Sequence, residues 1–416
     1  MRIGVNCFNL GPTIGGIKQY FLMLFDELLR HDHGNDYVFF WCPDNANELA
    51  QLASERWREQ AVLLAGQRRI RRHLEGLDLF FCPLGALYPR PLPLPSVVML
   101  PDIQEVFFPE FFTARALYAR DRHFLASTRM ADRVITISEF TKQTIVRHHH
   151  IPAEKVTVAH LCANPIFYGP SSATRAPARA LPDSFILFPA NFWQHKNHDA
   201  LLQALRLLER ERILPIDLVL TGHAVPNGYP VDAKAAEYGI AARVHNLGYV
   251  STQELAYLYR HARMLVFPSR FEGFGIPLVE AMASGCPIAA ADTTSIPEVT
   301  GPAALLFDPA SPREIADAVA RLWQDETLRQ ELSAAGKREA ERFSPARVAE
   351  IHLEAFAQAV RTHSSRRYLW HRWLYAPYHA GWAELRRLQR AGLLPGHPGS
   401  AAAANLNEIV RPSSAR

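Results

Sequence analysis

Two glutamates, Glu272 and Glu280, lie in the segment FPSRFEGFGIPLVEAMASG, which runs from Phe267 to Gly285. A strand pattern ends at Phe267, and Pro277 suits the first turn of a following helix, where its missing N–H costs nothing. Gly285 can end this helix. The N–H groups at the helix start suit a phosphate, and the carboxylates beside them can accept hydrogen bonds from sugar or ribose hydroxyls. We therefore expect a ligand that carries both groups; the alternative is a helix start whose acids are favoured by the macrodipole.

Short apolar runs alternate with helical patterns along the chain, which is typical of a parallel sheet covered by helices. The first strand pattern is followed by Gly15 and Gly16 and then by apolar residues at helical spacing. The expected strands are 2–7, 37–41, 77–82, 96–100 and 133–137, and then 185–189, 217–221, 243–247, 264–267, 287–290 and 304–307. The expected helices of the second half are 200–209, 252–259, 277–284 and 312–324.

A stretch rich in Pro, Ser and Ala separates the two halves and has the composition of an interdomain linker. The predicted parts are an N-terminal domain (1–167), the linker (168–184), a C-terminal domain (185–345), and a C-terminal helix with a basic aromatic tail (346–416). We thus predict an α/β fold with two doubly wound, Rossmann-like domains facing a central cleft, and a C-terminal helical extension. In such sheets ligands bind beyond the carboxyl ends of the strands.

The charge of the chain restricts its partners. The 416 residues carry a net charge of +4, which is too small to indicate a nucleic-acid partner. Residues 361–416 contain nine Arg, no Lys and two Glu, so this tail is basic. An anionic membrane surface is one expected partner of the tail, and a solvated terminus is the alternative. Four arginines at 68–72 leave the same choice between a solvated helix face and an anionic lipid.

The five cysteines show no C-x-x-C spacing, which argues against a disulfide scaffold or a structural zinc site. Cys7 and Cys286 lie in apolar runs and are expected in the core. The sequence shows neither a secretory pattern at its start nor an apolar run of about 18 residues. We expect a cytoplasmic protein, peripheral at the inner membrane face if the tail binds lipid. The run His148-His149-His150 is expected to be solvated rather than to bind metal.

Glu272 and Glu280 form an E-x7-E arrangement, and the chain resembles the retaining glycosyltransferases of the GT-B type, close to family 4. The resemblance covers roughly residues 1–360. It also rests on four further segments, namely ADRVITISEFT at 131–141, FILFPANFWQHKN at 185–197, SIPE at 295–298 and FDP at 307–309.

The resemblance implies a role for each matching position. Glu280 would hold the ribose of a nucleotide, and Glu272 would contact hydroxyls of the donor sugar. Lys196 would neutralise the leaving diphosphate. The other implied donor-binding groups are the N–H groups of Phe274, Gly275 and Ile276, and the backbone at Gly15 and Gly16.

The chain departs from the family pattern at two places. Asn191 stands where the family often has Arg, so the diphosphate charge would rest more on Lys196, with His195 as a helper. Pro101-Asp102 stands where the family often has His-Asp near the donor sugar. Asp102 or Gln104 would then substitute for that His, unless this segment is an ordinary loop.

The implied function is retaining transfer of a sugar, with mannose as one candidate, from a nucleotide-sugar donor to a glycan or lipid-linked acceptor in surface polysaccharide synthesis. The absence of a D-x-D motif argues for a reaction without a metal, and no cofactor is expected. Two alternatives are a sugar-nucleotide 2-epimerase of the GT-B type and a non-catalytic protein that binds sugar nucleotides. A Rossmann dehydrogenase is disfavoured because no strand is followed by G-x-G-x-x-G.

Overall fold

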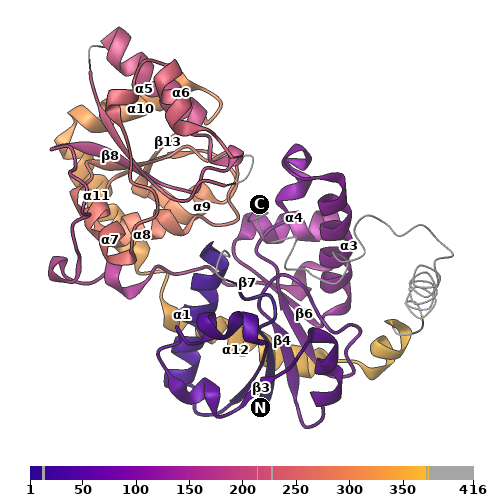
Figure 1. Ribbon diagram of the computed structural model, residues 1–416. Helices are drawn as coiled ribbons and strands as arrows, with labels where there is room; N and C mark the ends of the chain where they lie inside the picture. Colours follow the sequence, from indigo (N-terminus) through magenta and orange to yellow (C-terminus); the bar gives the residue numbers. More distant parts are fainter. Residues whose placement is uncertain (12–14, 213, 226–227, 372, 374–416) are drawn as a thin grey trace. The chain divides into compact units, whose positions relative to one another are not determined.

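The chain folds into two compact units (Figure 1). The computed structural model describes all residues except 12–14, 213, 226–227, 372 and 374–416. Unit 1 comprises Met1–Ile137, Thr141–Ala159 and Val348–Arg416, and unit 2 comprises Ser138–Phe140 and His160–Arg347. The stretch expected as a linker, 168–184, thus falls inside unit 2, and the chain returns to unit 1 after Arg347.

Unit 1 is built on a parallel sheet with the strand order β3-β2-β1-β4-β5-β6-β7. Its register places Val5 beside Phe39 on one side and Phe81 on the other. The strands are β1 (Arg2–Asn6), β2 (Asp36–Trp41), β3 (Ala61–Leu63), β4 (Leu79–Cys82), β5 (Ser96–Met99), β6 (Arg133–Thr136) and β7 (Val156–Val158).

Both faces of this sheet are buried. Successive side chains of a strand point to opposite faces, so Phe39 and Phe40 pack against helices on opposite faces of the sheet. The Phe39 ring packs against Phe25 of α1 (Gly15–His31), whereas Phe40 belongs to a core cluster that contains Ile145 of α4 (Glu139–His149). Further helices of unit 1 are α2 (Ala46–Leu49), α3 (Ala114–Met130) and, from Val348, α12 (Pro345–Thr362).

Helix α12 is the C-terminal helix that the sequence predicts, and it packs on unit 1. Phe356 lies against Phe81 of β4, with ring centroids 5.0 Å apart. Tyr20 of α1 is bonded to His352 of α12, with 2.6 Å between the hydroxyl oxygen and Nε2. Because His352 Nδ1 lies 2.7 Å from the Val348 carbonyl and donates to it, Nε2 accepts from Tyr20.

Unit 2 is built on a second parallel sheet, with the order β10-β9-β8-β11-β12-β13. The strands are β8 (Phe185–Pro189), β9 (Asp217–Thr221), β10 (Val244–Asn246), β11 (Met264–Phe267), β12 (Ile288–Ala291) and β13 (Ala304–Phe307). Helices α5 (His198–Arg212), α6 (Val231–Glu237) and α10 (Pro312–Gln324) form one layer, while α7 (Thr252–His261), α8 (Ile276–Ser284) and α11 (Glu326–Ala340) lie on the other side (Figure 1). The short helix α9 spans Ile296–Thr300.

Each sheet has a topological switch point, where the strand order reverses. In unit 1 this point lies between β1 and β4, and in unit 2 it lies between β8 and β11. The loops that follow the two central strands run in opposite directions there and leave a crevice at the carboxyl edge of the sheet. The fold therefore predicts that unit 2 binds its ligand with residues after Pro189 and after Phe267.

Most predicted strands are confirmed, four of them with the same bounds in unit 2. The strands β3 and β7 were not predicted. They are short edge strands whose residues are partly exposed, so they lack the continuous apolar run that marks a buried parallel strand. Cys7 and Cys286 are buried, as expected.

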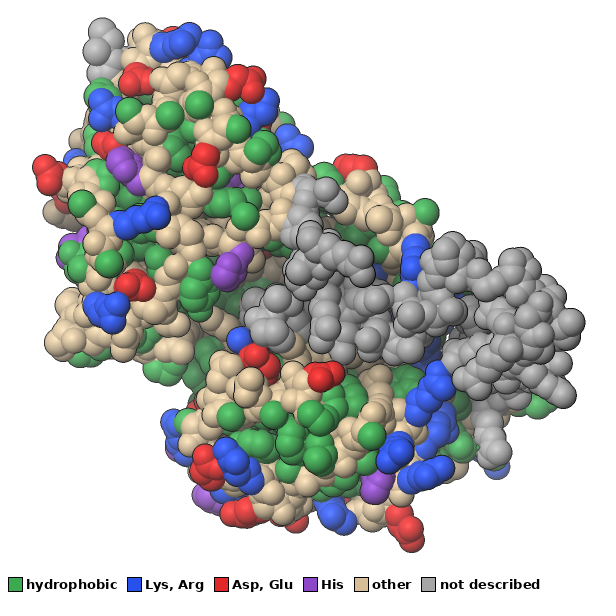
Figure 2. Space-filling view, viewed as in Figure 1, with side chains coloured by type: hydrophobic (Ala, Val, Ile, Leu, Met, Phe, Trp, Pro, Cys, Tyr) green, Lys and Arg blue, Asp and Glu red, His purple; other side chains and the backbone are tan. Residues whose placement is uncertain are grey.

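The visible face of the molecule mixes Lys and Arg with Asp and Glu rather than presenting one sign of charge (Figure 2). Over the part of the chain that the structure describes, no helix has both the length and the apolarity needed to span a bilayer.

Candidate functional site

The helix that carries Glu280 begins and ends as its sequence predicts. Gly275 is the N-cap of α8 with a φ of +99°, and Pro277 occupies the first turn. Gly285 ends the helix in the left-handed conformation, with a φ of +72°, and its N–H bonds to the carbonyls of Ala281 and Met282. The loop after β11 therefore turns abruptly into α8 and presents the first N–H groups of the helix, which have no partner within it.

Lys196 and Glu272 meet at the switch point of unit 2. Lys196 ends a 3-10 turn (Gln194–Lys196) in the loop after β8, and Glu272 lies in the loop after β11. The Lys196 Nζ atom is 2.7 Å from Glu272 Oε1, and the two side chains are 17% and 11% exposed. A cation and a carboxylate thus lie side by side where the strand order predicts a ligand.

Asn197 ties the two loops of this pair together. It has a φ of +62°, a left-handed conformation that Asn tolerates better than most residues. Its Nδ2 donates to the carbonyls of Pro268 and Pro309, at 3.0 and 2.8 Å. Because Pro268 opens the loop that leads to Glu272, Asn197 fixes the position of Lys196 relative to Glu272.

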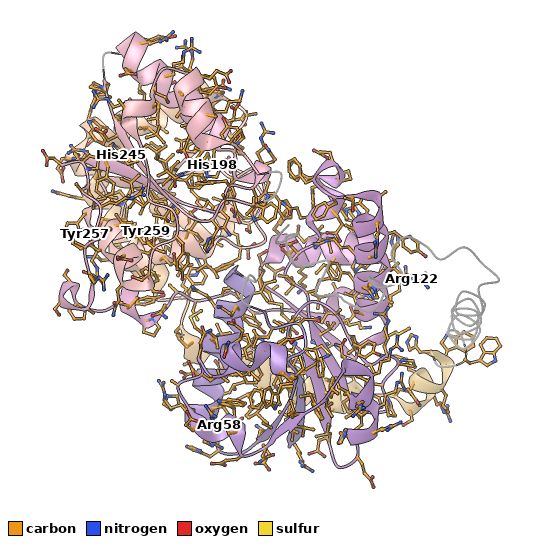
Figure 3. The ribbon with its side chains drawn as sticks, in the orientation of Figure 1. Arg58, Arg122, His198, His245, Tyr257 and Tyr259 are labelled. Atoms are coloured by element: carbon orange, nitrogen blue, oxygen red, sulfur yellow. The ribbon has the colours of Figure 1, made fainter. Side chains whose placement is uncertain are left out.

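Glu280 is 5% exposed and lies in the second turn of α8. The hydroxyl of Tyr259, a residue of α7 labelled in Figure 3, donates to Glu280 Oε2 at 3.0 Å. Burial raises the pKa of Glu280 to about 7, although the hydrogen bond from Tyr259 opposes this shift. The two glutamates therefore have different partners, Lys196 for Glu272 and Tyr259 for Glu280.

The backbone around Glu272 is held by hydroxyl groups. Thr294 Oγ1 accepts from the Glu272 N–H at 3.2 Å, and Ser295 Oγ lies 2.9 Å from the Glu272 carbonyl and 3.1 Å from the Phe274 carbonyl. Ser138 Oγ donates to the Gly273 carbonyl at 2.7 Å. The three consecutive carbonyls of this turn are thus all bonded to serine hydroxyls.

Three more of the predicted donor-binding positions, Phe274, Gly275 and Ile276, form the start of α8, and the Phe274 side chain is buried. Asn191 uses its Oδ1 to accept from the His223 N–H at 2.8 Å, which links the loops after β8 and β9. Burial lowers the pKa of His195 well below its usual range, with the charge of Lys196 acting in the same direction. Neutral His195 can donate a hydrogen bond but adds no charge to the site.

The remaining predicted residues, Gly15, Gly16 and Asp102, belong to unit 1. The two glycines begin α1 after β1. Asp102 follows β5, and its Oδ1 accepts from the N–H of Gln104 at 3.2 Å and lies 4.0 Å from Nη2 of Arg120. Within unit 1, the start of α1 follows the carboxyl end of β1, and Asp102 lies in the loop after the carboxyl end of β5.

The structure corrects the expectation for the histidine run at 148–150 and adds three residues to which the sequence assigned no role. His149 was expected to be solvated, but it is buried and its Nδ1 lies 2.8 Å from Thr128 Oγ1. Across the described ranges, the structure contains no group of three or more His, Cys, Asp or Glu arranged to hold a metal ion. Sequence reasoning assigned no role to Asn197, Tyr259 or Ser295. Asn197 and Ser295 lie in segments that carry the family resemblance, but their partners are distant in sequence.

Comparisons with known proteins show which families and which known folds this chain resembles. Residues 173–339 match the family described as glycosyl transferases group 1, and residues 14–165 match glycosyltransferase family 4. O-antigen chain mannosyltransferase B from Escherichia coli is 30% identical over 261 residues, an alignment that covers 60% of this chain and 66% of the relative. The chain thus spans just under two thirds of that relative.

Solved structures show the same fold. Sucrose-phosphate synthase from Thermosynechococcus elongatus superposes with a TM-score of 0.70 at 18% identity, over 87% of this chain and the whole of that one. HepE from Anabaena in complex with UDP-glucose gives a TM-score of 0.67 at 17% identity, over 86% and 99% of the two chains. The predicted pair of Rossmann-like domains of GT-B type is therefore confirmed. With a family match on each half of the chain, the protein belongs to the GT-B glycosyltransferases of the family 4 type.

Proposed function

We propose that this chain is a retaining glycosyltransferase that moves mannose from a nucleotide-sugar donor to a glycan or lipid-linked acceptor in surface polysaccharide synthesis. The observation that carries the proposal is the Lys196–Glu272 pair at the switch point of unit 2, beside the start of α8. The mannosyltransferase relative supports the choice of sugar, and the UDP-glucose complex of HepE supports a nucleotide-sugar donor.

The site suits the charge that develops when the donor reacts. The bond between the sugar C1 and the diphosphate oxygen breaks, and a new bond forms between C1 and the acceptor oxygen. Negative charge grows on the leaving diphosphate, which accepts the proton of the acceptor hydroxyl, while C1 gains oxocarbenium character. Lys196 and the N–H groups of Phe274, Gly275 and Ile276 would stabilise the diphosphate. Glu272 would accept hydrogen bonds from sugar hydroxyls.

Donor binding would change the partner of Lys196. In the structure its ammonium group faces Glu272, and phosphate oxygens would compete for the same donors. Glu272 would then be free to bind the sugar. Lys196 would thus exchange Glu272 for the diphosphate, and Glu272 would exchange Lys196 for the sugar hydroxyls. Glu280, buried beside Tyr259, would bind the ribose. Asp102 of unit 1 remains a predicted catalytic residue. Gly15 and Gly16 of unit 1, together with Asn191 and His195, remain predicted donor-binding positions.

The proposed reaction uses no metal ion or other cofactor. Its positive charge comes from Lys196 and the start of α8, which replace the divalent ion that other sugar transferases hold on the diphosphate. We expect turnover to persist in excess EDTA. Loss of turnover that added Mg²⁺ restores would contradict a metal-independent reaction.

A donor panel separates this proposal from its two alternatives. Thermal shifts with UDP, GDP, ADP, GDP-mannose, UDP-glucose and ADP-glucose identify the nucleotide, because a bound ligand raises apparent stability. Product analysis by NMR then tests transfer. A transferase should need an acceptor for rapid release of nucleoside diphosphate and should retain the anomeric configuration. An epimerase should alter the sugar without an acceptor, and a binding protein should show stabilisation without turnover.

We also propose that the C-terminal segment touches an anionic membrane surface. Beyond Thr362, the described part includes a helical segment at 365–371 with exposed Arg366 and Arg367. Leu369, Trp370 and Trp373 are 58%, 59% and 69% exposed. Exposed tryptophan beside arginine suits the headgroup region of a bilayer. The rest of the predicted tail lies outside the described residues.

Vesicle sedimentation tests this membrane contact. We expect weak, salt-sensitive binding of the full chain to vesicles that contain anionic lipid, and weaker binding of the double variant Trp370→Ala/Trp373→Ala. Leu63→Ala, at a residue of β3 that is 57% exposed, is the matched control. Equal binding of all three proteins would contradict the proposal.

A further inference from the structure

Residues Ser138, Glu139 and Phe140 follow β6 in the sequence, yet they group with unit 2. Their contacts explain the grouping. The Ser138 hydroxyl donates to the carbonyl of Gly273, the residue directly after Glu272. The ring of Phe140 packs edge-on against Phe271, with centroids 6.0 Å apart. This tripeptide thus contacts the Glu272 turn on both sides of Glu272 itself.

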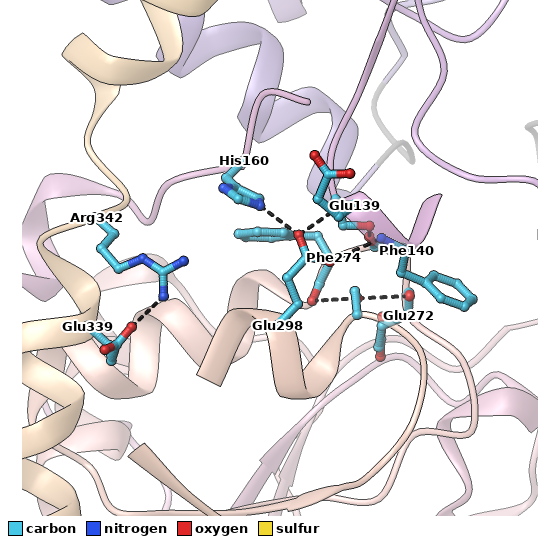
Figure 4. Close-up of polar contacts among 11 residues, drawn as sticks. Glu139, Phe140, His160, Glu272, Phe274, Glu298, Glu339 and Arg342 are labelled. Atoms are coloured by element: carbon cyan, nitrogen blue, oxygen red, sulfur yellow. Dashed lines mark hydrogen bonds and ion pairs between the residues drawn. The ribbon is translucent and has the colours of Figure 1, made fainter. Parts of the chain in front are cut away.

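Glu298 of α9 holds this tripeptide in place (Figure 4). Its Oε1 accepts from the Glu139 N–H at 2.8 Å, and its Oε2 accepts from the Phe140 N–H at 3.1 Å. These are the first two N–H groups of α4, which have no partner within the helix. The Nε2 atom of His160 lies 2.8 Å from Oε1. Burial opposes a charge on Glu298, but the hydrogen bonds from His160, Glu139 and Phe140 outweigh it and lower its pKa.

Glu298 reaches the turn by a second route as well. The His160 ring that bonds to Glu298 lies 5.8 Å from the ring of Phe274, centroid to centroid. Phe274 also packs edge-on against Phe343 at 5.6 Å. Phe274 is therefore held between two rings, one of which is oriented by Glu298.

Thr294, close to Glu298 in sequence, has an unfavourable backbone conformation where it contacts the Glu272 turn. Its φ of +54° lies in the left-handed region, which is unfavourable for a β-branched residue. This conformation accompanies the contact between Thr294 Oγ1 and the Glu272 N–H. Strain of this kind persists where the surrounding structure over-determines it, and here it lies beside the candidate sugar-binding carboxylate.

We propose that Ser138 and Glu298 are positioning residues of the transfer reaction: Glu298 fixes Ser138–Phe140, and Ser138 fixes the Glu272-Gly273-Phe274 turn so that the Glu272 carboxylate meets the donor sugar. The proposal rests on the proposed function, since it takes Glu272 as the sugar-binding residue. Neither positioning residue touches substrate. Their effect passes through the Gly273 carbonyl and the Phe274 ring.

The test compares Ser138→Ala and Glu298→Gln with Ser311→Ala, which removes a capping hydroxyl from α10 in the same unit without touching the turn. Turnover of the donor found in the panel gives kcat, and calorimetry with its nucleoside diphosphate gives Kd. We expect kcat to fall about tenfold in both test variants while Kd changes by less than about twofold. Ser311→Ala should change neither. Wild-type kcat in both test variants, or a parallel loss of nucleotide affinity, would overturn the proposal.

A double variant separates positioning from general destabilisation. If Ser138 acts through Glu272, the double variant Ser138→Ala/Glu272→Gln should have the kcat of Glu272→Gln alone. The loss of Ser138 then has no further effect, because the carboxylate that Ser138 positions is already absent. Additive losses would contradict the proposal. If either Ser138→Ala or Glu298→Gln fails to fold, the kcat and Kd of the other variant still test the proposal. Full activity of Glu272→Gln would refute the proposed site itself, whereas an impaired Glu272→Gln beside an unimpaired Ser138→Ala and Glu298→Gln would refute the positioning alone.

Discussion

The Lys196 ammonium group lies 2.7 Å from the Glu272 carboxylate although 76 residues separate them in the chain. The two residues follow β8 and β11, which are neighbours in the sheet and bracket its switch point. A parallel sheet brings the carboxyl ends of its strands to one edge, so the strand order alone places these two loops together. The ion pair is partly buried, and its partners can be exchanged for phosphate and sugar oxygens of a ligand.

Glu272→Gln should lower kcat more than it weakens nucleotide binding. Glutamine keeps the shape of the side chain but loses the charge that strengthens hydrogen bonds from sugar hydroxyls. We expect kcat to fall by about 100-fold and the Kd of the nucleoside diphosphate to change by less than about threefold. Calorimetry beside a turnover assay measures both. Glu237→Gln, at an exposed glutamate paired with Lys234, is the matched control and should leave kcat unchanged.

Glu280→Gln should make the protein more stable at alkaline pH. Burial raises the Glu280 pKa to about 7 in the folded state, so the folded protein binds the proton more tightly than the unfolded chain. The stability that this proton contributes is fully present below about pH 4.5 and is lost as the pH rises through about 7. Glutamine avoids the buried charge.

The free energy of unfolding, measured by urea titration at several pH values, tests this linkage. Glu280→Gln should exceed the wild type by as much as about 3 kcal/mol at pH 8, and the difference should vanish near pH 4.5. A difference that is independent of pH would show that Glu280 is not the titrating group. Nucleotide affinity should fall in the same variant, because the ribose would lose its carboxylate.

Gly275→Ala should impair turnover through the backbone. The N-cap glycine of α8 has a φ of +99°, and a Cβ there would lie 2.9 Å from Leu278 Cδ1. We expect a loss of about 1–2 kcal/mol in stability together with reduced kcat, because the turn that presents the first N–H groups must shift. Gly239→Ala shares the positive φ, +75°, without a close contact, and serves as the control. It should lose similar stability but keep its kcat.

Tyr20→Phe should weaken the docking of α12 on unit 1. The change removes the hydroxyl that donates to His352 Nε2 and leaves this buried nitrogen without that donor. We expect a loss of about 1–3 kcal/mol in the free energy of unfolding at pH 7.5. Tyr249→Phe, at a tyrosine that is 70% exposed, should change stability by less than about 0.5 kcal/mol. Equal stability of Tyr20→Phe and the wild type would contradict this account of α12.

The sequence predicted the elements that depend on local patterns. Buried strands such as β8 and β11 follow from their apolar runs, and the bounds of α8 follow from Gly275, Pro277 and Gly285. The partners of the site residues could not be predicted in this way. Tyr259 reaches Glu280 across two helices, and Ser138 reaches Gly273 across 135 residues, so both contacts depend on tertiary packing rather than on spacing. The grouping of Ser138–Phe140 with unit 2 has the same cause.

The most direct test of the central claim is calorimetric binding of nucleoside diphosphate to Lys196→Ala. Lys234→Ala, which breaks an exposed ion pair with Glu237 in the same unit, is the control. If Lys196 grips the diphosphate, its removal should weaken binding about tenfold or more and lower kcat about 100-fold, while Lys234→Ala binds and turns over as the wild type does. Wild-type diphosphate affinity in Lys196→Ala would contradict the assignment of the Lys196–Glu272 pair as the donor site.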